Sequence, residues 1–405
     1  MSLRPQDIEF LRGLPQRVED AGMHDLGDVV RLLVVALLSG GHVLLEGNPG
    51  LGKTALVKAL SSALCLGAGA VGRIQFTPDL MPSDITGTLM PDPEDARRLV
   101  FKKGPVFHEL LLADEINRAS PKTQAAMLEA MAEFQVTVLG DTHILRETCQ
   151  ISSPDGLCEL RSPFMVMATQ NPIDQDGTFP LPEAQLDRFM FKVQMELPGA
   201  AAMERIVAKE LAAAQQTGSR LSPPPEKAGV RNSSLIALDR AARGVMALRA
   251  PPSVLTHIVN IVMASNARFD AVRGLSPRRM AALKELVSGS IEYPLGPRGA
   301  IALSKAALGW SAMVLTEPDR AEEAAASSRS GLAAVLTPVL RHRLRVTHDY
   351  GQAINSAFEE GRQQEAMIHA LAKAAAPDQR VGEDPAGYAD RFSGDLEAAV
   401  ELHKF

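Results

Sequence analysis

The chain has 405 residues, of which 46% are hydrophobic and 22% charged, and its formal net charge is −6. This composition is that of an ordinary globular protein and excludes a fibrous or wholly disordered chain. The acidic balance gives no overall support for nucleic-acid binding, and the longest apolar runs, such as Leu32–Leu38, are too short to cross a membrane. With no apolar signal core after Met1 and no C-x-x-C pair, we expect a cytoplasmic protein with buried, reduced thiols.

The predicted elements divide the chain into four parts. Apolar residues at helical spacing predict helices before residue 38, and from 42 to about 198 short apolar runs alternate with helical stretches, as in a parallel sheet covered by helices. The predicted strands are Val43–Glu46, Arg73–Phe76, Leu110–Ala113, Phe164–Thr169 and Phe191–Met195. We therefore expect an α/β core at 1–215, a linker at 216–231, a helical domain at 232–345 and a C-terminal helical tail at 346–405.

Residues 47–54 match the phosphate-loop pattern G-x-x-x-x-G-K-[ST] without deviation. The loop consists of Gly47, Asn48, Pro49, Gly50, Leu51, Gly52, Lys53 and Thr54. In this pattern backbone N–H groups surround phosphate oxygens, the lysine reaches the β- and γ-phosphates, and the final hydroxyl binds Mg²⁺. A predicted strand precedes the loop and a helix with an apolar face follows it, which places the loop where anions bind. The sequence thus predicts ATP and Mg²⁺ as ligands, against the alternative of a glycine-rich turn in an ordinary α/β unit.

Two carboxylates, Asp114 and Glu115, stand at the end of the predicted strand 110–113. We expect Asp114 to hold Mg²⁺ through water and Glu115 to polarise the attacking water, which needs a carboxylate within hydrogen-bond reach. Alone, such a pair is more often a solvated strand end. Its position about sixty residues after a phosphate loop favours the catalytic interpretation.

Several blocks of the sequence resemble the MoxR family of AAA+ ATPases. These blocks are 76–87, 104–107, 112–119, 128–131, 168–172 and 181–189. The resemblance covers roughly residues 8–345 and implies an AAA+ phosphate-loop core with hairpin insertions followed by an all-α lid. It also implies a homo-oligomeric ring, a hexamer, that uses Mg·ATP to remodel a protein client. A von Willebrand factor A domain adaptor is implied as a separate protein, because this chain lacks a D-x-S-x-S stretch.

The resemblance also implies roles for three further residues. Asn171 resembles sensor 1, which orients the attacking water or the γ-phosphate, and a turn-forming Asn before Pro172 is the alternative. Arg188 resembles the arginine finger that acts on the neighbouring subunit's nucleotide, with a surface salt bridge as the alternative. For sensor 2 we prefer Arg298, because residues 300–307 resemble the family's continuation. The pattern that the family usually shows, Gly-x-Ser-Pro-Arg, occurs instead at 274–278 and leaves Arg278 open. For either arginine, a solvated residue that caps a helix is the alternative.

Two insertions, 79–104 and 133–147, interrupt the predicted core, and the second reads as strand, turn and strand. The resemblance implies hairpins that contact the client, and hairpins that only brace the sheet are the alternative. A nucleic-acid-directed AAA+ motor is a second hypothesis for the whole chain, although the net charge and the few aromatic residues weigh against it. A scaffold that binds ATP with little turnover is the third, and the presence of Glu115 and Arg188 weighs against it.

Overall fold

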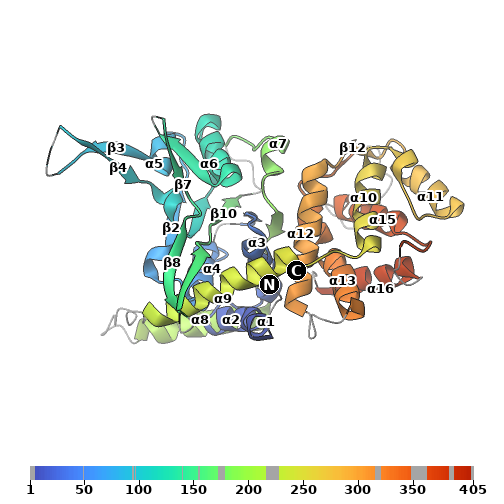
Figure 1. Cartoon of the computed structure of the whole chain (residues 1–405), viewed down its shortest axis with the longest axis horizontal. Helices are drawn as coiled ribbons and strands as arrows, with labels where there is room; N and C mark the ends of the chain where they lie inside the picture. The colour runs from blue at the N-terminus through green and yellow to red at the C-terminus, as the bar shows by residue number, and fades with distance from the viewer. Residues whose placement is uncertain are drawn as a thin grey trace. The chain divides into compact units, whose positions relative to one another are not determined.

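The computed structural model describes residues 5–48, 50–93, 95, 97–138, 140–153, 156–171, 178–215, 228–314, 321–347, 363–382 and 387–402. The chain forms two compact units (Figure 1). The core unit consists of residues 9–181 and 193–241, and the lid unit consists of residues 1–8, 182–192 and 242–405. The lid unit therefore includes one short segment, 182–192, that lies within the core unit's stretch of sequence.

A five-stranded sheet with the strand order β11-β1-β10-β5-β2 is the centre of the core. Its strands are β1 (Val43–Glu46), β2 (Val71–Gln75), β5 (Leu110–Asp114), β10 (Met165–Gln170) and β11 (Phe191–Gln194), and the first two residues of β11 are grouped with the lid unit. The pairs β1–β10, β10–β5 and β5–β2 are parallel. All but the last residue of β1, β5 and β10 are buried, as expected for a parallel sheet covered on both faces. The five predicted strands and the α/β class are thereby confirmed.

Helices follow the strands in the order that the sequence pattern predicts. The core helices and helical turns are α2 (Leu14–Asp20), α3 (Gly27–Ser39), α4 (Lys53–Ala63), η1 (Ala68–Ala70), α5 (Pro82–Thr86), η2 (Pro105–Phe107), η3 (Ile116–Arg118), α6 (Pro121–Glu133) and α8 (Ala200–Gln215). Two further helices, α1 (Pro5–Arg12) and α9 (Ala228–Ala247), have some of their residues in each unit. Two residues favour the start of α6 at this point: the Ser120 side chain accepts a hydrogen bond from the Thr123 amide, and Pro121 occupies the first turn. The predicted linker 216–231 lies outside the described residues up to 227.

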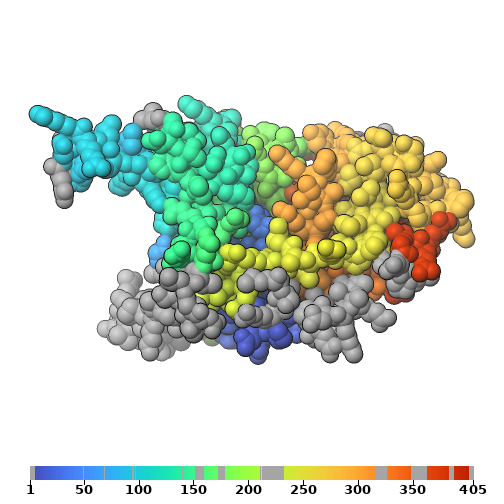
Figure 2. Space-filling model, in the orientation of Figure 1, coloured from blue at the N-terminus to red at the C-terminus, as the bar shows by residue number. Residues whose placement is uncertain are grey.

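Three hairpins interrupt the core. They are β3 (Gly87–Pro91) with β4 (Leu99–Lys103), β6 (Gln135–Val138) with β7 (Asp141–Ile144), and β8 (Thr148–Ser153) with β9 (Gly156–Arg161). The sequence predicts the first two and misses the third. The rings of Phe101 and His143 stack with their centroids 4.0 Å apart and so join the first two hairpins. The β3–β4 hairpin stands out from the core surface (Figure 2).

The lid unit is helical. Its elements are α7 (Glu183–Leu186), α10 (Pro252–Ser265), η4 (Phe269–Ala271), α11 (Pro277–Val287), α12 (Pro297–Val314), α13 (Ala321–Leu340), α15 (Gln363–Ala375) and α16 (Tyr388–Leu402). A two-stranded ribbon of β12 (Ile291–Tyr293) and β13 (Arg345–Val346) accompanies them, which the sequence pattern does not predict. Two helices of the predicted tail, α15 and α16, are part of this unit and contribute the buried side chains of Leu371 and Phe392 to it.

Two further expectations concern thiols and membrane spans. The expected burial of the thiols is wrong for two of them, since Cys65 is half-buried in the turn after α4 and Cys149 is exposed on a hairpin strand. The side chain of Cys158 lies outside the described residues. Within the described ranges no single helix is both long and apolar enough to span a membrane, although the bent pair 232–247 and 252–265 meets the length and composition test.

Candidate active site

The phosphate loop connects β1 to α4, and two of its glycines are required by the backbone. Gly52 precedes the helix with φ of 78°, in the left-handed region that side chains with a Cβ rarely adopt. A Cβ on Gly47 would lie 2.6 Å from the carbonyl oxygen of Met195. Pro49 lies outside the described residues. Because the loop ends at the N-terminus of an eleven-residue helix, unpaired backbone N–H groups and the helix dipole both favour an anion there.

Lys53, the first residue of α4, connects the loop to the acidic pair. Its Nζ donates to the Gly47 carbonyl oxygen at 2.6 Å. Burial lowers the pKa of Lys53, and the negative charges of Asp114, Glu115 and Glu46 act in the opposite direction. The loop follows β1 and the acidic pair ends β5, and both strands pair with β10, so the two motifs lie at the same edge of the sheet. The structure therefore brings together the two motifs that the sequence places about sixty residues apart.

A single hydroxyl on a neighbouring strand orders the two carboxylate residues. The Thr169 Oγ1 donates to Asp114 Oδ1 at 2.8 Å and accepts from the Glu115 amide at 2.9 Å. Glu115 has φ of 55°, so the chain turns sharply at the strand end. Thr169 is 1% exposed. The sequence motifs assign no role to Thr169. The one feature of the sequence that could have pointed to it is its position two residues before Asn171, in the block 168–172.

Three more polar side chains surround the acidic pair, and none of them is predicted. Arg73 on β2 donates from Nη2 to Asp114 Oδ2 at 2.8 Å. Gln75, two residues further along the same strand, donates from Nε2 to Glu115 Oε2 at 3.1 Å. The Arg118 Nε lies 3.0 Å from the same Glu115 oxygen. The sequence feature that could have indicated the first two is the alternation of side chains along β2, which puts Arg73 and Gln75 on the same face of the strand, beside β5.

Asn171 and Thr54 lie at the same edge of the sheet. Asn171 directly follows β10, whose last residue, Gln170, pairs with Glu46 at the end of β1. Thr54 follows Lys53 in the first turn of α4. The carboxyl ends of parallel strands meet at one edge, which is where ligands of open α/β sheets bind. The roles of Asn171 and Thr54 remain predictions.

The predicted arginines all lie in the lid unit. Arg188 belongs to the 182–192 segment and follows Asp187. Arg298, in the first turn of α12, has its Nη1 3.9 Å from Asp187 Oδ2. Arg278 is exposed in the first turn of α11, next to Ser276, which is bonded to Asp378. The lid thus brings Arg298, and not Arg278, to the segment that carries Arg188, while the choice of sensor 2 remains a prediction.

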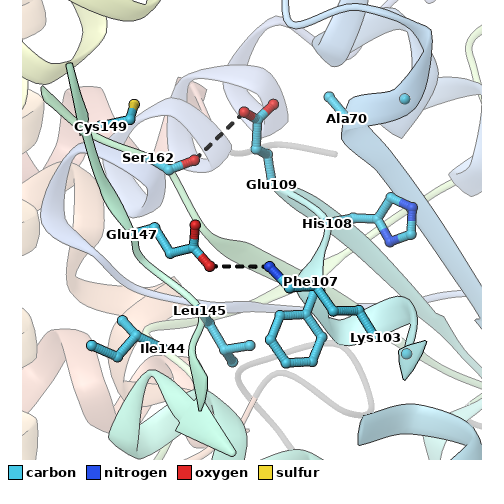
Figure 3. Close-up of a pocket in the computed structure, with 12 residues that line it drawn as sticks. Ala70, Lys103, Phe107, His108, Glu109, Ile144, Leu145, Glu147, Cys149 and Ser162 are labelled. Atoms are coloured by element: carbon cyan, nitrogen blue, oxygen red, sulfur yellow. Dashed lines mark hydrogen bonds and ion pairs between the residues drawn. The ribbon is translucent and has the colours of Figure 1, made fainter. Parts of the chain in front are cut away.

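A separate pocket of about 440 Å³ lies at the base of the hairpins (Figure 3). Its walls include the ion pair of Lys103 and Glu147, with Nζ and Oε1 3.1 Å apart, the exposed Cys149, and Ser162, which donates to Glu109. No residue of the phosphate loop or of the acidic pair lines it. This pocket is therefore distinct from the candidate active site.

The residues of the candidate active site fit a nucleoside triphosphate with a divalent cation. A Cβ placed on Gly50 would meet no atom within 4 Å, so the middle of the loop has open space beside it. The Lys53 ammonium and the backbone N–H groups match phosphate oxygens, and the Thr54 hydroxyl and the Asp114 carboxylate are hard oxygen ligands of the kind that Mg²⁺ prefers. Asn48 and Leu51 complete the loop around this space.

The parallel sheet, the phosphate loop and the strand-end carboxylates define the chain as a phosphate-loop ATPase of the AAA class. Residues 42–191 match the family described as "ATPase family associated with various cellular activities (AAA)". The chain is 41% identical to the uncharacterised protein YeaC of Bacillus subtilis, over 63% of this chain and 71% of that protein. It is 37% identical to Chaperone MoxR1 of Mycobacterium tuberculosis, over 58% of this chain and 55% of that one.

A solved structure supports the same assignment. The crystal structure of a candidate ATPase from Cytophaga hutchinsonii superimposes with a TM-score of 0.64 at 27% identity, covering 90% of this chain and 96% of that one. The chain belongs to the MoxR family of AAA+ ATPases, with an α/β core and a helical lid. The match covers little more than half of MoxR1.

Proposed function

We propose that this chain hydrolyses ATP with Mg²⁺ and works as a homo-oligomeric ring, a hexamer, that remodels or activates a protein client. The observation that carries the ATPase part is the charged network at the carboxyl edge of the sheet. There Lys53, Asp114 and Glu115 interact, and Thr169 fixes the two carboxylate residues relative to each other. An ATP-binding scaffold needs the lysine and has no use for a water-activating carboxylate beside it.

The proposed division of labour follows from the chemistry of each side chain. Lys53 and the loop amides bind the phosphates, and Thr54 and Asp114 hold the metal. When bound, Mg²⁺ neutralises the charge that develops on the phosphate oxygens. Glu115 accepts a proton from the attacking water, whose oxygen bonds to the γ-phosphorus as the bond to the β-phosphate oxygen breaks, giving ADP and phosphate. Asn171 orients the water through its amide.

The arginines give a reason for the ring. A residue whose charge is needed on a neighbour's phosphates makes hydrolysis depend on assembly, and we propose that Arg188 is such a finger. Arg298 is proposed to contact the nucleotide of its own subunit as sensor 2. Its first-turn position on α12 and its 3.9 Å approach to Asp187 support it over Arg278.

We further propose that the partners are a protein client and a separate von Willebrand factor A domain adaptor. The net charge of −6 disfavours the alternative of a nucleic-acid motor, because such binding is dominated by phosphate neutralisation. The similarity to a protein named as a chaperone favours a protein client. The hairpins β3–β4 and β6–β7 are the proposed contact surface, with Met90, Leu99 and Ile144 exposed on them.

Substitution of Glu115 tests the proposed hydrolysis. Glu115→Gln keeps the size of the side chain and removes the base, so we expect ATP binding to persist while turnover falls by ~10²–10⁴-fold. Lys53→Ala should instead weaken nucleotide binding. Fluorescent-nucleotide binding and phosphate release measure the two effects. Glu147→Gln, an exposed carboxylate of the same core, is the matched control and should behave as wild type. Wild-type turnover by Glu115→Gln would refute the assignment.

A further inference from the structure

The loop that carries Arg188 is bound by a buried arginine of the lid. Arg343 donates from Nε to Asp187 Oδ1 at 2.7 Å and from Nη2 to the Asp187 carbonyl oxygen at 3.1 Å. The same guanidinium group donates to the carbonyl oxygens of Phe189, Met190 and Val339. All five N–H donors of the side chain are therefore used. Four of the five bonds go to residues 187–190, which immediately flank Arg188.

This arrangement fixes the loop more firmly than a surface ion pair could. The Arg343 side chain is only 4% exposed, and burial lowers its pKa while the Asp187 charge opposes that shift. A planar group with five donors at fixed angles can satisfy several carbonyl oxygens at once, which a lysine ammonium group in its place cannot. Removing it would take its donors away from the carbonyl oxygens of Asp187 and Met190 and leave the Phe189 oxygen with one donor fewer. The neighbouring His342 adds a further bond from Nε2 to the Phe189 carbonyl oxygen at 3.0 Å.

Asp187 has a second arginine partner. Its other carboxylate oxygen, Oδ2, lies 3.9 Å from Arg298 Nη1. One carboxylate thus stands between the buried Arg343 on one side and the 61% exposed Arg298 on the other. The residue next to it in the chain is Arg188. All four residues are part of the lid unit, although Asp187 and Arg188 lie more than a hundred residues before Arg298 and Arg343 in the sequence.

We propose that Arg343 and Asp187 are positioning residues that hold the segment of the arginine finger, between α7 and β11, against the lid residues that carry Arg343. The inference rests on the proposed function of Arg188. It adds a route of communication, because Arg298, proposed to contact a subunit's own nucleotide, shares a carboxylate with the loop that serves the neighbour. A change at Arg298 can thereby act on Arg188 through the shared Asp187 carboxylate, which Arg343 holds on its other side.

The test uses Arg343→Lys and the milder Asp187→Asn in assembled rings. A displacement of about 1 Å can cost ~10²-fold in rate, so we expect turnover to fall by roughly 10- to 100-fold while the Kd for a fluorescent ADP analogue changes less than about twofold. Hydrogen exchange in the peptide 182–192 should become faster and that of the loop 47–54 should not. Arg345→Gln is the matched control, since it removes an exposed ion pair of 2.8 Å between Nη2 and Glu183 in the same segment. It should leave turnover unchanged.

A double-mutant comparison separates positioning from a general structural role. If Arg343 acts through Arg188, adding Arg343→Lys to Arg188→Ala should lower turnover no further. Losses that multiply, together with a lower unfolding temperature and weaker nucleotide binding, would mean that Arg343 only stabilises the lid and would overturn the inference. So would wild-type turnover in both Arg343→Lys and Asp187→Asn. If Arg188→Ala alone leaves turnover intact, the proposed finger itself is wrong and the inference is overturned with it.

Discussion

At the scale of single residues, the acidic pair depends on a hydroxyl from another strand. Thr169 donates to the Asp114 carboxylate, a hydrogen bond to a charged group that is worth about 1.5–3 kcal/mol, and accepts from the neutral Glu115 amide, which is worth about 1 kcal/mol. Glu115 directly follows the strand in a left-handed backbone conformation, with φ of 55°. In the proposed mechanism Asp114 holds the metal and Glu115 activates the water, and Thr169 fixes the two residues relative to each other.

Arg73 gives a prediction at this scale. Its guanidinium group donates to Asp114 Oδ2 at 2.8 Å, so it competes with a divalent cation for a proposed metal ligand. Arg73→Met keeps most of the apolar stem and removes the charge. Because Arg73 is half-exposed and such pairs contribute ~1 kcal/mol or less, we expect the Mg²⁺ concentration for half-maximal hydrolysis to fall by up to about fivefold. Magnesium titrations measure it, with Arg97→Met as the control. A higher requirement for Mg²⁺ would contradict the expectation.

The sequence predicts the residues of this site that belong to contiguous motifs and misses those that reach it from other strands. Gly47 through Thr54 and the pair of Asp114 and Glu115 are recognisable because spacing along one segment determines their chemistry. Arg73, Gln75 and Thr169 reach the same carboxylates only through strand register, here Gln75 with Asp114 and Ala168 with Ala113. A single sequence does not contain that register.

At the scale of helices and strands, the lid is held together by a buried neutral histidine. His257 on α10 donates from Nε2 to the Ala372 carbonyl oxygen at 2.8 Å, and in the uncharged imidazole its Nδ1 accepts from the Tyr388 hydroxyl at 3.1 Å. The Phe392 ring packs edge-on against the imidazole, with the centroids 4.4 Å apart. One side chain therefore joins α10 to α15 and α16, and its bonds suit the uncharged form.

This histidine predicts a pH-dependent stability of the lid. Burial lowers the pKa of His257 to about 4 from 6.5, so the unfolded chain binds a proton between those values and the folded chain does not. The contribution of the uncharged His257 to the free energy of unfolding is fully present above pH 6.5. It is lost as the pH falls towards 4, by up to ~1.4 kcal/mol per pH unit. Urea unfolding followed by Trp310, the chain's one tryptophan, reports on α12. His257→Gln should reduce the slope between pH 6.5 and 5 without abolishing it, because burial also lowers the pKa of His42 and His342, and an unchanged slope would contradict the assignment.

The elements themselves could be predicted where the periodicity is strong. The buried strands of the sheet consist of near-continuous apolar runs, and their ends agree with the structure to within two residues. The hairpin β8–β9 is missed although Thr148 and Gln150 alternate with apolar Cys149 and Ile151, because the second strand, Gly156–Arg161, does not keep a period of two. The β12–β13 ribbon is missed because its strands have three and two residues and lie more than fifty residues apart.

At the scale of the whole molecule, the assignment of residues to units follows contacts and not sequence order. Residues 182–192 lie between β10 and the second half of the core in sequence, yet they belong to the lid unit through Arg343 and His342. A division of the sequence into consecutive ranges places this segment in the core, because the residues that bind it lie about 150 positions later in the chain. For function, the consequence is that the proposed finger belongs to one unit and the proposed nucleotide site to the other.

The central claim is that hydrolysis occurs at a site completed by Arg188 of a neighbouring subunit. The most direct test mixes Arg188→Ala subunits, which keep the nucleotide site, with Lys53→Ala subunits, which keep the finger. In mixed rings roughly a quarter of the interfaces would pair an intact site with an intact finger, so hydrolysis should rise well above the sum of the two proteins alone. Mixing Arg188→Ala with subunits that carry both substitutions is the control and should give no recovery. If the first mixture forms rings and also fails to recover hydrolysis, Arg188 does not act between subunits and the account is contradicted.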